Sequence, residues 1–175
     1  MTRDDLRNLM KYGSYVLILF FSYILQATPG IGFLGVKPML VLPACICIAF
    51  LEDEFSGGLL GVFAGIFCDF SSDTVFGFNA LLFLIFCVGA GLAAEYAVRR
   101  SLINVMLFSL TAVFLRAGLE FVFSFALYRY EGAAAYFYTV MGPEIVLTSV
   151  FTPLYFFLTK LVHHRFRPSS EREQS

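Results

Sequence analysis

The sequence predicts an all-α fold, a polytopic membrane helical bundle of about six helices. Of the 175 residues, 59% are hydrophobic and 14% are charged, and the mean hydropathy is +0.79. Soluble domains average about 45–50% apolar and about 25% charged residues, so this chain lacks the polar surface of a water-soluble fold. Apolar runs fill nearly the whole length, which leaves little chain for a separate soluble module. We expect one membrane domain over residues 1–162 and a short cytoplasmic tail over residues 163–175.

Turn-forming residues divide the apolar sequence into six predicted helices. The expected spans are residues 12–27, 38–51, 57–70, 79–98, 101–128 and 143–162. Pro38 and Pro143 suit a first helical position, because the N–H that proline lacks needs no partner there. Ser56 is expected to cap the third helix. The polar stretches 52–54 and 71–73 close the second and third helices.

The second and third predicted helices are short for a membrane. At about 1.5 Å per residue they reach roughly 21 Å, whereas the hydrocarbon core is about 30 Å thick. Either the bilayer thins around them, or they form a re-entrant hairpin tucked between the other helices. The sequence leaves this choice open.

Basic residues predict the orientation. With the N-terminus inside, the outer loops hold only Lys37 and Arg129. The segments then assigned to the cytoplasm carry Arg3, Arg7, Lys11, Arg99, Arg100, Lys160, Arg165, Arg167 and Arg172. This asymmetry predicts that both termini are cytoplasmic. We expect the first helix to be an uncleaved span, because no small-residue cleavage site follows it.

Several function classes lack support in the sequence. The net charge of −1 is not that of a nucleic-acid binder. The four cysteines lie in apolar segments without a nearby histidine, so we interpret them as buried thiols, with no metal and no cofactor. No nucleophile motif or phosphate loop is present, and we expect no enzymatic activity.

The third helix carries a glycine face. Gly57, Gly61 and Gly65 recur at four-residue spacing, and Asp69 follows at the same spacing. Glycines let another helix approach at backbone distance, and such packing is a main source of helix association in lipid. The face packs against a neighbouring helix of the chain or, as the alternative, receives a helix of a partner protein. For Asp69 we expect a polar partner on a neighbouring helix, since Asp69 and Asp73 alone make a weak cation site.

A charged pair lies within the fifth predicted span. Arg116 and Glu120 are four residues apart and so share a helix face. A charge at mid-bilayer costs about 2.5–3.5 kcal/mol on insertion scales, which predicts that the two side chains point inward and pair. The pair is either a binding or relay site within the membrane or a structural pair that fixes the helix orientation. Glu95 and Arg99 have the spacing of a second such pair.

These motifs together resemble the family of the rod shape-determining protein MreD. The resemblance rests on Leu25-Gln26, Pro38, Gly57-x3-Gly61-x3-Gly65-x3-Asp69 and Gly77-x-Asn79-Ala80-Leu81. It is densest between residues 25 and 100, and the chain length and number of spans agree over the whole chain. The acidic residues 52–54 depart from the basic or neutral loop expected there.

The resemblance implies a subunit of the elongation machinery in the bacterial cytoplasmic (inner) membrane. It implies a non-enzymatic scaffold or regulator of lateral peptidoglycan synthesis and cell shape, surrounded by membrane lipids. The implied partner is an MreC-like protein, and through it MreB, RodA and a penicillin-binding transpeptidase. The family also looks like the membrane-embedded substrate-binding components of energy-coupling-factor transporters. The alternative is therefore a vitamin-binding subunit, and an intramembrane enzyme is a remote third possibility.

Overall fold

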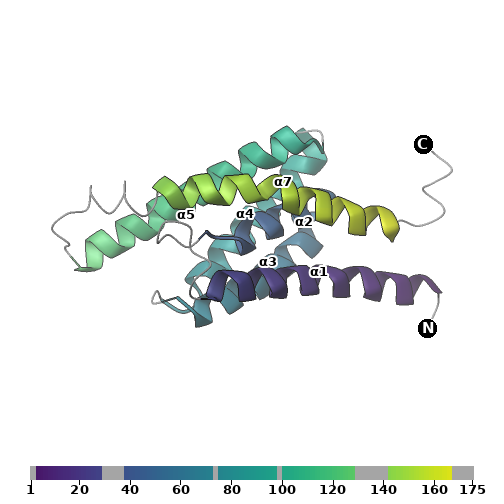
Figure 1. The fold of residues 1–175 in the computed structure, drawn as a ribbon, viewed down its shortest axis with the longest axis horizontal. Helices are drawn as coiled ribbons and strands as arrows, with labels where there is room; N and C mark the ends of the chain where they lie inside the picture. The colour runs from purple at the N-terminus through teal and green to yellow at the C-terminus, as the bar shows by residue number, and fades with distance from the viewer. Residues whose placement is uncertain (1–2, 29–37, 73–74, 98–99, 129–141, 167–175) are drawn as a thin grey trace.

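The computed structural model describes residues 3–28, 38–72, 75–97, 100–128 and 142–166, and within these segments it is all-helical (Figure 1). The helical bundle predicted from the sequence is thereby confirmed. A π-helical turn at Ala93–Ala97 extends the fourth helix. The α-helices are α1 (Arg3–Ala27), α2 (Val41–Leu51), α3 (Glu54–Phe70), α4 (Phe78–Leu92), α5 (Leu102–Tyr128) and α7 (Gly142–Arg165).

Four of the helical segments are long and apolar enough to cross a membrane. They are Asp5–Ala27, Phe78–Ala97, Leu102–Val122 and Gly142–Arg165. Large apolar side chains cover their outer surfaces; Leu17 on α1 is 68% exposed and Phe157 on α7 is 69% exposed. Such surfaces suit lipid rather than water. The remaining two helices are shorter, with 17 residues in α3 and 11 in α2.

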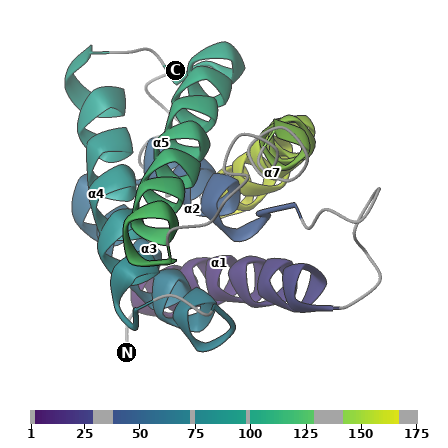
Figure 2. The same ribbon diagram turned by 90° about the vertical axis from the view of Figure 1, so that its left-hand side faces the viewer.

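The short helix α2 lies at the centre of the bundle (Figure 2). All eleven of its residues are buried, and it contacts α1, α3, α4, α5 and α7. Every residue of α2 is apolar, so no face of this helix needs water or lipid headgroups. A helix that is apolar all round belongs in a core. The bundle is therefore built around α2.

The second helix begins at Val41, not at Pro38 as the sequence suggested. The reason is that side chains of neighbouring helices accept the N–H groups of residues 39–41. The side-chain oxygen of Gln26 on α1 accepts the N–H groups of Leu40 at 3.0 Å and of Val41 at 3.2 Å. From α7, the hydroxyl of Thr148 accepts the N–H of Met39 at 3.1 Å. Neighbouring helices thus satisfy donors that an isolated helix end leaves open.

The two ends of the bundle carry different polar groups. Helix α1 begins and helix α7 ends at the same end, which we call the terminal end (Figure 1). The α2–α3 turn also lies towards the terminal end, because Glu52 in that turn contacts Lys11 and His163. The α3–α4 turn lies at the other end, which we call the opposite end.

Two members of the glycine face, Gly61 and Gly65, lie against α4. A Cβ atom on Gly65 would lie 2.5 Å from the Cα of Ala80, and one on Gly61 would lie 2.9 Å from the sulfur of Cys87. Both distances are shorter than any ordinary contact, so only glycine allows the α3 and α4 backbones this separation. The glycine face of α3 therefore packs within the chain.

At the start of α3, the remaining member of the glycine face, Gly57, packs against a different helix, and the cap residue differs from the expected one. A Cβ atom on Gly57 would lie 2.7 Å from the Cβ of Ala49, so Gly57 packs against α2. Asp53, not Ser56, is the N-cap residue: its carboxylate accepts the N–H of Ser56 at 3.3 Å. The helix consequently starts at Glu54, three residues before the expected position. An acid in the cap suits the positive end of the helix dipole.

The last helix is also longer than expected. It continues to Arg165, past the predicted boundary at residue 162, because His163 still packs against the bundle through Glu52. Residues 167–175 of the expected tail lie outside the described residues. The same holds for Lys37, Asp73, Arg99 and Arg129, so the proposed Glu95–Arg99 pair stays a prediction.

Replacing Gly65 with alanine tests the close approach of α3 and α4. We expect Gly65→Ala to lower the thermal stability of the detergent-solubilised protein by about 1–3 kcal/mol or more, because the contacted Ala80 atoms are backbone atoms that cannot turn away. Gly13→Ala is the matched control, since a Cβ atom there meets nothing within 4 Å. Equal melting temperatures for the two variants would contradict the packing described.

Candidate functional site

The carboxylate of Asp69 organises the turn between α3 and α4. It is 4% exposed and accepts four hydrogen bonds. Oδ2 accepts the N–H groups of Gly77 at 3.0 Å and Ala80 at 3.2 Å. Oδ1 accepts the backbone N–H of Asn79 at 2.9 Å and its side-chain Nδ2 at 3.0 Å. Amide donors thus stabilise this buried carboxylate, and no cation of the described residues lies at bonding distance from it.

The start of α4 is built to hold this carboxylate. Its first N–H groups lack partners within the helix and carry the positive end of the helix dipole, so they favour an anion. Asp69 from α3 supplies that anion. Gly77 has φ +94°, a left-handed conformation that favours glycine and turns its N–H towards Asp69. Helix α3 thereby caps helix α4.

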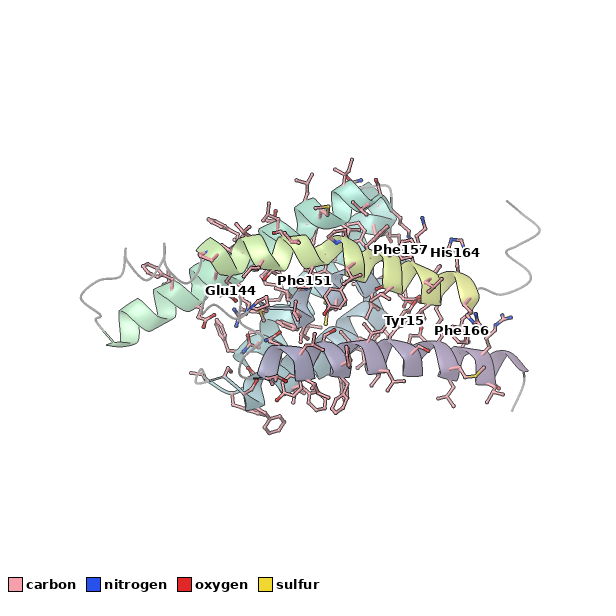
Figure 3. All side chains as sticks on the ribbon, viewed as in Figure 1. Tyr15, Glu144, Phe151, Phe157, His164 and Phe166 are labelled. Carbon is pink, nitrogen blue, oxygen red and sulfur yellow. The ribbon has the colours of Figure 1, made fainter. Side chains whose placement is uncertain are left out.

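Asn79 connects this cap to the charged residues of α5. It is fully buried, and its Oδ1 accepts the Nε–H of Arg116 at 3.2 Å. The guanidinium of Arg116 pairs with Glu120 on the same helix at 2.8 Å and lies 3.8 Å from Glu144 in the first turn of α7. Figure 3 labels Glu144 at this position. One continuous polar network therefore joins α3, α4, α5 and α7 at the opposite end.

We call Asp69, Asn79, Arg116, Glu120 and Glu144 the opposite-end cluster. Its charged side chains are only partly accessible: 11% for Arg116, 19% for Glu144 and 30% for Glu120. Two carboxylates, those of Glu120 and Glu144, share the guanidinium of Arg116, whereas Asp69 is stabilised by amide donors. The cluster orients four helices and offers polar groups at the edge of the apolar region. Within the described segments no group of three or more His, Cys, Asp or Glu side chains is arranged to hold a metal ion.

The structure brings together three of the residues singled out from the sequence. Asp69, Arg116 and Glu120 meet in the opposite-end cluster, and the Arg116–Glu120 pair is formed. Two members were missed as site residues. Asn79 was predicted to begin the fourth helix, and Glu144 fell in the predicted sixth helix without a role of its own in a site. The signal for Asn79 was available in the Gly77-x-Asn79 motif, which places an amide side chain beside the cap.

A second polar group, the terminal-end cluster, surrounds Glu52. The Glu52 side chain is 6% exposed, and the sequence suggested only a loop residue there. Oε1 accepts the hydroxyl of Tyr15 at 2.7 Å, and Oε2 accepts the ammonium of Lys11 at 2.7 Å. His163 Nδ1 lies 2.9 Å from Oε1. These contacts tie α1 and α7 to the end of α2.

The hydrogen bonds of Glu52 change its pKa. Burial alone would raise the pKa of the carboxyl, but hydrogen bonds from His163, Lys11 and Tyr15 together outweigh burial and lower the pKa from 4.5 to about 2. Glu52 is therefore ionised throughout the physiological range. The departure from the expected basic or neutral loop thus has a structural reason, because the acid is a buried acceptor for two other helices.

Comparison with known proteins gives no relative for this chain: no protein-family model, no curated protein and no solved structure matches it. The two clusters are therefore interpreted from their geometry. Both consist of groups that bind and orient, and each joins helices that are distant in the sequence.

Removing the charge of Glu52 is expected to destabilise the bundle. Because the pKa of Glu52 is lower in the folded than in the unfolded state, its stabilisation is present above about pH 4.5 and is lost as the pH falls towards about 2. Glu52→Gln should cost roughly 2–3 kcal/mol at neutral pH and flatten this acid dependence. Unfolding curves at several pH values measure both effects. The exposed Glu95→Gln is the control, and an unchanged acid dependence in Glu52→Gln would refute the assignment.

A double-mutant cycle tests the Arg116–Glu120 pair. Arg116→Ala should lower the unfolding free energy by about 1–3 kcal/mol, because it leaves carboxylates without their cation. Adding Glu120→Ala should recover part of that loss, since the double variant has no orphaned Glu120. The two residues do not act as a pair if the double variant loses as much unfolding free energy as the two single variants together, or more.

Proposed function

We propose that this chain is a non-enzymatic membrane scaffold of the MreD type, a regulatory subunit of the bacterial cell-elongation complex. The observation that supports this most is where the residues of the resemblance lie. Gly65, Asp69, Gly77, Asn79 and Ala80 form one buried assembly, in which Asp69 caps α4 and Gly65 lets Ala80 approach. Residues that are separated in the sequence of the motif thus lie together at the contact between α3 and α4.

A sixth residue of the resemblance has a comparable role. Gln26 closes α1 and bonds the start of α2, at Leu40 and Val41. The resemblance therefore falls on residues that hold the central helices in place. This supports a shared architecture, including its likeness to the six-helix components of energy-coupling-factor transporters.

The proposed location is the bacterial cytoplasmic membrane, with both termini in the cytoplasm. Two observations support it. Helix α1 begins and helix α7 ends at the same end of the bundle (Figure 1). That end carries Lys11, which contacts Glu52; Arg100, which contacts Leu51; and Arg165, the last residue of α7. The proposed partner is an MreC-like protein, with MreB, RodA and a penicillin-binding transpeptidase bound indirectly. In this role the chain supports lateral wall synthesis and cell shape.

Purification of the tagged chain from native membranes in mild detergent tests the proposal. We expect an MreC-like protein and wall-synthesis proteins to be recovered with it, and depletion of the chain to make rod-shaped cells round. Gly65→Leu, which should open the α3–α4 contact, should lose the partners, whereas Gly13→Leu should keep them. A bound vitamin or an ATPase module in the purified sample would instead establish the transporter alternative and refute the scaffold.

A further inference from the structure

The opposite-end cluster has more carboxylates than its donors can satisfy. Asp69 accepts four N–H groups, and Glu120 holds Arg116 at 2.8 Å. These contacts account for two acids and for the only guanidinium of the cluster. Glu144 is the acid that remains. Among the described residues its closest charged partner is Arg116 at 3.8 Å, beyond hydrogen-bonding distance.

No other described helix supplies a cation to Glu144. Helices α2 and α4 have no charged residue, and α1 has none after Lys11, which lies at the terminal end. On α3, the nearest ionisable groups are Asp69 and the buried thiol of Cys68. The described charged groups nearest Glu144 are Arg116, at 3.8 Å, and Glu120, which pairs with the same guanidinium. The Glu144 side chain is 19% exposed.

An ionised carboxylate in these surroundings is unfavourable. Burial removes the water that stabilises the charge, and the guanidinium is already engaged by Glu120. Protonating the carboxyl, which removes the charge, costs far less free energy than keeping an unpaired anion there. From this geometry we propose that Glu144 carries a proton at neutral pH and that loss of this proton changes the contact between α7 and α5 at the opposite end. We call this contact the proton-dependent latch.

The latch follows from the shared guanidinium. With Glu144 neutral, Arg116 stays on Glu120 and the contact to α7 remains long, as observed. When Glu144 loses its proton to water, its carboxylate competes for Arg116 and also repels Glu120. The spacing between α5 and the first turn of α7 then depends on the proton concentration at that end. This inference rests on the cluster alone and does not depend on the proposed function.

Infrared spectroscopy of the full chain in lipid nanodiscs tests the proton directly. A protonated carboxyl has a carbonyl band well separated from that of a carboxylate. At neutral pH we expect such a band in the wild-type protein. It should shift when the glutamate carboxyls are isotope-labelled and stay in place when the aspartate carboxyls are labelled.

Substitutions assign the band to one residue. It should disappear in Glu144→Gln and persist in Glu120→Gln, the same change on the facing helix. Should Glu144→Gln fail to fold, Glu144→Asp decides, because its band should respond to the aspartate label instead. A wild-type protein without a glutamate-sensitive band, a band that survives in Glu144→Gln, or one that vanishes only in Glu120→Gln would overturn the proposal.

A distance measurement tests the latch itself. Spin labels at the exposed positions Leu119 on α5 and Val146 on α7 report the separation of the two helices. We expect the distance distribution to shift when the pH is raised above neutral, and to stay fixed in a chain that also carries Glu144→Gln. A wild-type distribution that is independent of pH would refute the coupling, whatever the infrared result.

Discussion

The structure depends on keeping a short helix, α2, at the centre of an apolar bundle. A buried helix cannot leave its end groups to water, so each end needs partners from other elements. Gln26 of α1 supplies them at the start, and Arg100 supplies one at the other end by donating to the carbonyl of Leu51 at 2.9 Å. The positions of the neighbouring helices follow from this requirement, because the partner side chains must reach α2.

A second constraint connects the glycines of α3 to the opposite-end cluster. The close approach at Gly65 brings the start of α4 against the last turn of α3. Only at that separation can the Asp69 carboxylate reach the N–H groups of Gly77, Asn79 and Ala80. Packing and capping are therefore coupled: a wider spacing would leave a buried carboxylate and open helix donors unsatisfied at once, and each such group costs about 1–3 kcal/mol.

The helices could be predicted from the sequence because long apolar runs separated by polar turns leave little alternative in a membrane protein. The glycine spacing likewise defined a face of α3. It could not show that α4 and α2 occupy this face, because spacing identifies a helix surface and not its neighbour. The start of α2 was placed too early for a similar reason, since the donors that set it are bonded by Gln26, 14 and 15 residues away, and by Thr148, 109 residues away.

For charged residues too, the sequence predicts pairs within one helix but not pairs between helices. The pair Arg116–Glu120 could be predicted because both members lie on one helix at a spacing of four residues. Glu52 was interpreted as part of a loop because Lys11 is 41 residues away and His163 is 111 residues away. Local pattern identifies partners within a helix, whereas partners across helices require the fold.

The two clusters hold helix α7 differently at its two ends. At the terminal end, His163 contacts Glu52, an ionised acid that also accepts from Lys11 and Tyr15. At the opposite end, the charged partner of Glu144 among the described residues is Arg116, at 3.8 Å. Between them, Pro153 lacks the N–H that would bond the preceding turn, so the helix bends more easily there. The charged contact at the first turn of α7 is the longer of the two, 3.8 Å against 2.9 Å at His163, and the one that a change of charge on Glu144 would alter.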